Sequence, residues 1–328
     1  MQMIVSVSIR RVRVAALLLL AAAAVSASAQ EFPVKPVRWI VPYAPGGSSD
    51  ILARLIGQKL AESWGRAVIV DNRPGAAGNI GTEVVAHAAP DGYTLLLVAS
   101  TFAMNPSVYP KLAFDPVNDF APVTMIMWQP FILSAHPSLP VTSVRQLIAL
   151  ARQHPGELNF SSGGSGTSGH IAAALFETMA NVKLTHVPYR SMGPAITALL
   201  TGEVQLSFNT SIAVSPYVRM GKVRPLGVTG LKRIAALPAV PTIAEAGVPG
   251  YEEGAWQGVL APAATPRAMI ARLNQDLVRT IKARETSARI EDVGADVVAG
   301  TPEEFAAAIK ADMQKYAKLV KAAGIRAE

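Results

Sequence analysis

Short apolar runs and stretches with helically spaced apolar residues alternate along most of this chain. Val37–Val41 is a compact apolar run that predicts a strand, and positions 51–60 carry apolar residues three and four apart, as a helix with one buried face does. Further strands are expected at 68–70 and 93–99, with a helix at 80–88 between them. This order predicts a parallel βαβαβ sheet flanked by helices.

The same alternation begins again after position 143, which predicts a second α/β unit of similar size. Each expected strand is again separated from the next by a helix or a turn. Helices are expected at 144–152, 170–180 and 194–200, and strands at 158–161, 182–188, 204–208 and 223–229.

Positions 120–144 contain no Lys, Arg, Asp or Glu but include four prolines, which break helices. This stretch is therefore expected to be extended chain that passes between the two units. Beyond the second unit, 256–260 is expected to be extended and 267–283 helical. A final helix is expected from Pro302 to about 322, with Thr301 as its N-cap.

The first 29 residues have the organisation of an export signal. Three arginines, Arg10, Arg11 and Arg13, precede an uncharged apolar run, and the small-x-small triplet ASA (27–29) follows. An N-terminal membrane anchor is the alternative, but the run is short of the ~20 residues that span a bilayer. We expect cleavage after Ala29 and a soluble, exported protein, located in the periplasm if the source is Gram-negative.

Composition narrows the function further. The 328 residues are 50% hydrophobic and 16% charged, which suits a folded core and excludes intrinsic disorder. There is no cysteine, so disulfides, thiolate metal sites and cysteine nucleophiles are excluded. The net charge of +7 falls to +4 without the three N-terminal arginines, and this gives no strong case for nucleic acid as a partner.

Two glycine-rich loops stand at matching positions, each after the first strand of its unit and before a helix. These are PGGSS (45–49) and GGSGTSG (163–169). Ligands of open α/β sheets sit at the carboxyl ends of strands, and a helix N-terminus offers N–H groups and positive partial charge. Two such loops facing each other predict a cleft for a small anion; the alternative is that both are ordinary strand-to-helix turns.

The second loop fits G-x-G-x-x-G, but the next expected strand ends in VPYR (187–190) without the acid that dinucleotide binding requires. No G-x-S-x-G elbow and no H-E-x-x-H motif is present. His170, in the first turn after the loop, either contacts or orients the ligand or fills a supporting role. We therefore expect no catalytic residue, metal or cofactor, and no enzyme.

The chain resembles the solute-binding proteins of tripartite tricarboxylate transporters, also called Bug proteins. The ordered set of motifs carries this resemblance over essentially the whole mature chain. The motifs are YAPGGSSD (43–50), NRPGAAG (72–78), PDGY (90–93), SSGGSGT (161–167), VPYR (187–190), LPAVPT (237–242) and APAATP (261–266).

The resemblance implies a two-lobed α/β periplasmic binding protein of type II-like fold, each lobe a mixed sheet flanked by helices, with two crossing strands as hinge. The implied crossings lie near 125–133 and 253–260. Residues 30–127 plus 256–328 would form the first lobe and 128–255 the second. The implied ligand is a small carboxylate, a di- or tricarboxylate or an aromatic acid, held largely by backbone N–H groups and ordered water at the glycine loops.

Carried over by position, the resemblance implies a ligand site built from both lobes. Asp50 is expected to support its own helix rather than to touch the anion. The ligand-binding residues would be Tyr43, Gly46, Gly47, Ser48, Ser100, Thr101, Ser165, Gly166, Thr167, His170, Tyr189, Arg190 and Asn209.

The chain departs from the family pattern at two of its positions. Ser191 stands where glycine often follows the Tyr-Arg pair, and Asn209 where an acid is frequent. A neutral Asn gives an ammonium group no charge-assisted partner, which favours a carboxylate without an amine. The implied partners are the membrane subunits of a tripartite transporter, with the receptor a monomer. A periplasmic sensor that presents the ligand to a membrane signalling protein is the alternative, and a periplasmic enzyme a weaker one.

Overall fold

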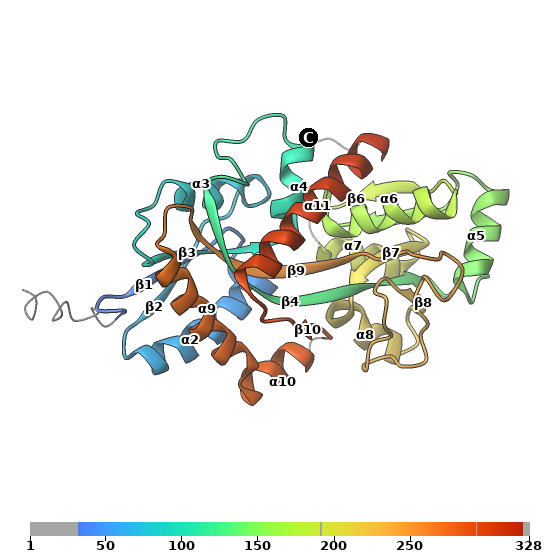
Figure 1. Cartoon of the computed structure of the whole chain (residues 1–328). Helices are drawn as coiled ribbons and strands as arrows, with labels where there is room; N and C mark the ends of the chain where they lie inside the picture. The colour runs from blue at the N-terminus through green and yellow to red at the C-terminus, as the bar shows by residue number, and fades with distance from the viewer. Residues whose placement is uncertain (1–31, 191, 293, 324–328) are drawn as a thin grey trace, which may run out of the picture.

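The computed structural model describes residues 32–190, 192–292 and 294–323, and its strands join into one mixed sheet that runs through two lobes. The sheet order is β2-β1-β3-β9-β4-β7-β5-β6, with β8 and β10 each paired to β4 outside this path. Helices cover both faces of the sheet (Figure 1). The proposed signal segment lies outside the described residues.

The first α/β unit is parallel, as the sequence predicts. Residues of β1 lie between those of β2 and β3, with Trp39 opposite both Val70 and Leu95. The elements are β1 (Val37–Val41), α2 (Ser48–Trp64), β2 (Val68–Asn72), the 3₁₀ turn Ala76–Gly78, α3 (Asn79–Ala86), β3 (Thr94–Ala99) and α4 (Thr101–Val108).

The second unit repeats this arrangement with β5 between the parallel strands β6 and β7, so Phe160 lies opposite both His186 and Leu206. The two glycine-rich loops connect β1 to α2 and β5 to α6. The elements are α5 (Val144–Gln153), β5 (Asn159–Ser162), α6 (Ser168–Ala180), β6 (Thr185–Pro188), α7 (Met192–Thr201), β7 (Leu206–Thr210), α8 (Ser211–Arg219) and β8 (Arg224–Val228).

Two antiparallel strands connect the lobes. β4 (Phe120–Ala135) pairs along its first part with β9 (Gly254–Pro262) and along its last five residues with β7, next to β8. β9 in turn pairs with β3 of the first lobe. The extended crossing that the uncharged stretch predicts is confirmed, and each lobe is a mixed sheet because these antiparallel strands border its parallel ones.

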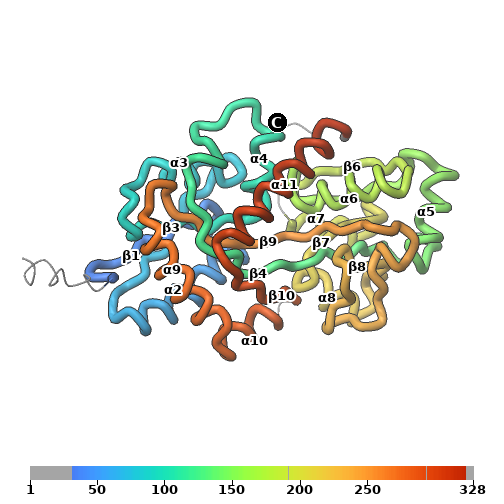
Figure 2. Tube along the Cα trace, in the orientation of Figure 1, coloured from blue at the N-terminus to red at the C-terminus, as the bar shows by residue number. Residues whose placement is uncertain are grey.

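The C-terminal helices α9 (Arg267–Lys282), α10 (Arg284–Asp292) and α11 (Pro302–Ala323) follow β9, with the short strand β10 (Asp296–Val297) before the last of them. In Figure 2, α11 runs obliquely across β4 toward α6 of the second lobe, which it contacts. Its apolar face packs in one cluster with α4 and α6, through side chains such as Leu319, Phe102 and Ile171. This cluster holds the two lobes together on one face of the sheet.

Buried charged groups fix α11 to the crossing strands. Glu253, fully buried just before β9, pairs with Lys315 and accepts a hydrogen bond from the Tyr316 hydroxyl at 3.0 Å. Trp256 Nε1 donates to Asp312 at 2.6 Å. Burial raises the pKa of Glu253, and the Lys315 ammonium opposes that rise. A buried carboxylate needs such partners, so α11 and the start of β9 are held in one arrangement.

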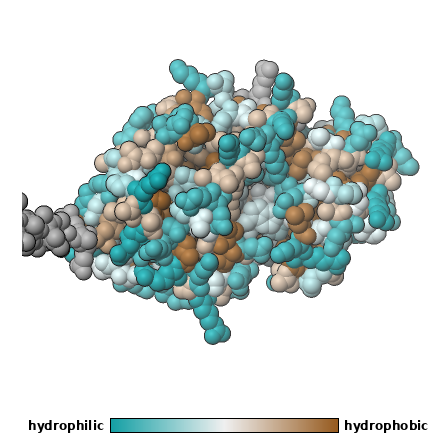
Figure 3. Space-filling model, viewed as in Figure 1, coloured by the Kyte–Doolittle hydropathy of each residue, from teal (hydrophilic) through white to brown (hydrophobic). Residues whose placement is uncertain are grey.

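The surface is mostly hydrophilic on the face drawn in Figure 3, where apolar side chains form small separate groups. A water-exposed protein surface has this character. Among the described residues, no helix combines the length and apolar character needed to cross a membrane.

Gly258→Ala should destabilise the protein, because a Cβ at this position of β9 would lie 2.3 Å from Cζ of Phe305 and 2.9 Å from the backbone oxygen of Thr124. We expect the free energy of unfolding, measured by urea denaturation, to fall by about 1–3 kcal/mol. Gly193→Ala in α7 is the matched control, since its Cβ would meet nothing within 4 Å. Equal stability of Gly258→Ala and the parent protein would contradict the described packing.

Candidate functional site

The carboxyl ends of the parallel strands of the two lobes face each other. β3 is antiparallel to β9, β9 to β4 and β4 to β7, so β3 and β7 run in opposite directions toward the same gap. The loops that follow β1 and β3 therefore lie opposite those that follow β5 and β7. Ligands of open α/β sheets bind at such strand ends.

The first glycine loop is held by its own helix. The Gly46 N–H donates to Asp50 Oδ2 at 2.9 Å, and Gly46 has a φ of +79°, which favours glycine. The hydrogen bond from Arg54 is the main cause that lowers the pKa of Asp50. The sequence predicts that Asp50 supports its own helix; the structure shows that it holds the loop as well, while Gly47 and Ser48 stay exposed.

Tyr43 connects this loop to the end of β3. Its hydroxyl lies 2.9 Å from Thr101 Oγ1 and accepts the Ala99 N–H at 3.2 Å. Burial raises the pKa of Tyr43, so the phenol stays neutral. Ser48 Oγ accepts a long hydrogen bond from Gln257 Nε2 at 3.4 Å. Tyr43 is therefore joined to Thr101 at the end of β3, and Ser48 is joined separately to β9.

The second glycine loop is shaped by internal hydrogen bonds. Gly164 and Gly166 have φ values of +129° and +73°, and the Thr167 hydroxyl donates to the Gly164 oxygen at 2.8 Å. The Gly166 N–H donates to Nδ1 of His170 at 3.0 Å. His170 therefore orients the loop from the first turn of α6, and its proton is on Nε2 when the ring is neutral.

The His170 ring packs in a stack with two other rings. Its ring lies 3.8 Å from that of His186, centroid to centroid, and His186 stacks in turn on Phe160 at 4.9 Å. Burial lowers the pKa of His170 to about 4, and the repulsion of a charged His186 adds to this effect. His170 is therefore neutral at pH 7 and can accept the Gly166 N–H.

The second glycine loop contacts α4 of the first lobe across the gap. Ser100 Oγ, at the start of α4, lies 3.3 Å from Ser168 Oγ, at the start of α6. Gly166 is buried against α4, since a Cβ there would be 3.4 Å from Cγ1 of Val108. The structure thus brings Ser100 beside the start of α6 and Gly166 beside the end of α4.

Helices α2, α4, α6 and α8 all begin at this gap without a side-chain cap. Their N-cap residues are Gly47, Ser100, Thr167 and Thr210, and none accepts a helix N–H through its side chain. The first N–H groups of a helix have no partner within the helix. The gap is therefore lined by backbone donors and by the positive ends of helix dipoles.

Three predicted residues stand apart from this group. The Tyr189 hydroxyl donates to Glu203 at 2.8 Å, beyond the end of α7, and Arg190 is exposed. Asn209 is fully buried on β7, where Nδ2 donates to Ser207 Oγ at 2.7 Å. Its Oδ1 has no hydrogen-bond partner among the described residues. A buried acceptor of this kind costs free energy unless something pairs with it.

Two amide side chains of the crossing strands were not predicted as site residues. Gln129 of β4 and Gln257 of β9 are 5% and 4% exposed. Gln257 Oε1 has no partner among the described residues. Each is the single amide of its strand, and this position in the sequence could have marked both residues as candidates for the site.

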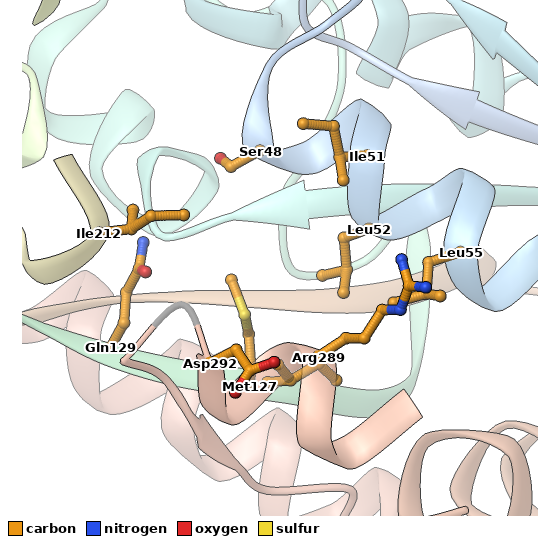
Figure 4. A pocket seen from close by; sticks show the side chains of 10 residues that line it. Ser48, Ile51, Leu52, Leu55, Met127, Gln129, Ile212, Arg289 and Asp292 are labelled. Atoms are coloured by element: carbon orange, nitrogen blue, oxygen red, sulfur yellow. The ribbon is translucent and has the colours of Figure 1, made fainter. Parts of the chain in front are cut away.

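A cavity of about 360 Å³ adjoins the first loop between α2, α8, α10 and β4 (Figure 4). Ser48 is the predicted site residue that lines it. The complete lining is Ser48, Ile51, Leu52, Leu55, Met127, Gln129, Ile212, Arg289, Ile290 and Asp292.

A serine–histidine pair lies beside the second glycine loop, where Ser162 Oγ and His186 Nε2 are 2.6 Å apart. Ser162 is fully buried and is also bonded to the backbone of Gly164. Its contacts are those of a group that shapes the loop. Within the described ranges, no cluster of His, Asp and Glu could hold a metal ion.

Comparison with known proteins decides the family. Residues 52–325 match the model of the tripartite tricarboxylate transporter family receptor. The chain belongs to this receptor family. Its relatives include the protein BugT of Bordetella pertussis, 34% identical over 301 residues that cover 91% of this chain and 92% of BugT.

Solved structures agree in fold and in sequence. A structure from R. palustris with adipate has a TM-score of 0.80 and 39% identity, and the match covers 90% of this chain and 99% of that one. MatC from Rhodopseudomonas palustris with bound malate has a TM-score of 0.76 and 32% identity, covering 88% and 100%. The receptor therefore has the two-lobed fold of the solute-binding proteins that the sequence predicts.

The receptor should lose stability as the pH falls from about 6.5 to 4. The pKa of His170 is near 4 in the folded chain and about 6.5 in the unfolded chain, so the unfolded chain binds the proton more readily in this window. The contribution is present above pH 6.5 and is lost on acidification. Urea denaturation at pH 7 and pH 4.5 measures it.

His170→Asn keeps an acceptor near the position of Nδ1 but does not titrate, so the loss between these pH values should shrink by about 1–3 kcal/mol. His87→Asn, at an exposed histidine next to α3, is the control. An unchanged pH dependence in His170→Asn would show that this ring does not titrate as described.

Proposed function

We propose that the receptor is a periplasmic solute-binding protein that captures a small carboxylate between its lobes and delivers it to a tripartite tricarboxylate transporter. The observation that carries the proposal is the convergence of four uncapped helix N-termini on one gap. Backbone N–H groups and helix dipoles favour a carboxylate there. The adipate and malate in the two related structures support this ligand class.

The proposed site needs no cationic clamp. α2 and α6 are 17 and 13 residues long, and each presents its first turn to the gap. Neutral His170 holds Gly166 in place and leaves the field of the helix end unchanged. We propose that the carboxylate is held mainly by Gly47 and Ser48 on one side and by Ser165 and Thr167 on the other. Gly46 and Gly166 would shape the two loops, because their N–H groups already donate to Asp50 and His170.

The remaining predicted residues have supporting or outer positions in this proposal. Tyr43, Thr101 and Ser100 fix the first-lobe side, and Asn209 offers its amide from β7. Tyr189 and Arg190 would lie at the edge of the site and contact the ligand only through rearrangement of their side chains.

The two lobes of the proposal are residues 30–127 plus 256–328 and residues 128–255, which places both boundaries where Trp128 pairs with Trp256 on the crossing strands. We propose removal of residues 1–29 on export, a monomeric receptor, and membrane subunits of the transporter as partners. The protein would act by binding alone and not as an enzyme.

A thermal-shift screen tests the ligand class. Protein that has been unfolded and refolded, so that bound solute is removed, is heated with di-, tri- and monocarboxylates, sugars, metal salts and NADP. A ligand at about a thousand times its Kd stabilises the folded state by ~4 kcal/mol, which corresponds to a rise in Tm on the order of 10 °C. We expect the rise with a carboxylate; a rise only with a sugar, metal or nucleotide would contradict the proposal.

Gly47→Asp should weaken binding of the carboxylate found in that screen by at least about tenfold, because it adds a like charge at the start of α2. Gly47 has an ordinary φ of −76°, and its Cβ would meet only the Ala44 oxygen at 3.4 Å, so folding should persist. Gly47→Ala is the matched control without charge. Titration calorimetry measures both, and equal affinity in the two variants would move the site elsewhere.

A further inference from the structure

The cavity beside the first glycine loop differs in character from the polar gap that it adjoins. Six of its ten lining residues are apolar, from three separate helices and β4. Its volume of about 360 Å³ lies within the range of small-molecule sites. In Figure 4 the apolar side chains of α2 stand opposite Ile212 of α8, with Met127 of β4 between them.

We propose that this cavity receives the apolar body of the bound carboxylate, so that the ligand is an acid with a hydrocarbon chain or ring rather than a hydroxylated polycarboxylate. The inference rests on the proposed function and specifies its substrate class. The carboxylate would sit at the Ser48 end, and the hydrocarbon would extend toward α10.

The walls of the cavity expose apolar side chains that a bound hydrocarbon would cover. Ile51 of the first lobe is 61% exposed and Ile212 of the second is 49% exposed. Single exposed apolar residues are common on proteins. Here, however, two of them line one cavity from two different lobes, and apolar groups gathered in this way are typical of binding sites.

The inner end of the cavity has the polar groups that a carboxylate requires. Ser48 begins α2 there, next to Gly47 and its uncapped helix end. The amide of Gln129 rises from β4 toward Ile212 in Figure 4. Gln129 is 5% exposed, and its side chain has no hydrogen bond to any described residue. Its N–H₂ group can donate to a ligand carboxylate.

The outer end does not favour a second anion. Arg289 and Asp292 of α10 both line it, and in Figure 4 the guanidinium lies near Leu55 while the carboxylate lies near Met127. A second ligand carboxylate would be attracted by Arg289 and repelled by Asp292. The opposite charges of Arg289 and Asp292 offset each other, so this end presents no net positive charge to a second carboxylate.

A series of straight-chain monocarboxylates from acetate to octanoate tests the inference on the refolded receptor by titration calorimetry. Each buried methylene should tighten the Kd by about fourfold until the cavity is filled. Malate and citrate serve as hydroxylated acids of comparable size and should bind more weakly than hexanoate, by at least about tenfold.

Ile212→Ser should weaken hexanoate and octanoate by about fivefold and leave acetate within about twofold, because the serine removes part of the apolar wall and acetate has almost no hydrocarbon to place against it. Ile69→Ser on β2 is the matched control, since Ile69 is 52% exposed and lies outside the cavity lining. This control should leave the whole series unchanged.

A Kd that does not depend on chain length, or malate binding more tightly than hexanoate, would overturn this inference and leave the proposed carboxylate receptor intact. Equal effects of Ile212→Ser and Ile69→Ser would also overturn it. If no carboxylate in either group binds, the proposed function itself fails.

Discussion

The pairing of β4 with β9 is the constraint on which the rest of the structure depends. These two antiparallel strands are the centre of the sheet, and each lobe adds its parallel strands to one side of them. The pairing brings Trp128 beside Gly254, where a Cβ would lie 2.3 Å from the Trp128 ring. Because β4 and β9 fix the direction of β3 and β7, the helix N-termini that follow those strands have to point at one gap.

The proposed ligand site is a consequence of that geometry more than of special side chains. Glycine occupies the positions of positive φ in both loops. The hydrogen bonds of Asp50, Thr167 and His170 shape those loops. What remains toward the gap is uncapped helix backbone and a few buried amides. In the proposed function, such a site would recognise a negative charge without a dedicated cation, and the neighbouring apolar cavity would determine which acid is preferred.

Regular elements with a clear apolar period were predictable from the sequence. β1 has the predicted bounds, and α5 and α9 differ from their predicted ends by one residue. Helices α4 and α8 were not predicted, because Pro106 and Pro216 interrupt any helical pattern. Both are held by tertiary packing, as the burial of Phe102 and Val214 shows.

For the site, the places of the two loops followed from motif and position, whereas the hydrogen bond by which Asp50 holds the first loop did not. The contact of Ser100 with Ser168 and the apolar cavity did not, because both depend on how the lobes and α10 lie against each other. The stack of His170 on His186 joins residues of α6 and β6, and no local pattern in the chain predicts this contact.

The most direct test of this account is the identity of the small molecule that co-purifies with the native receptor, determined by mass spectrometry of the released ligand. The account predicts a carboxylate whose remaining atoms are mainly hydrocarbon. A sugar, a nucleotide or a highly hydroxylated acid such as citrate, released in stoichiometric amount from the folded receptor, would contradict it.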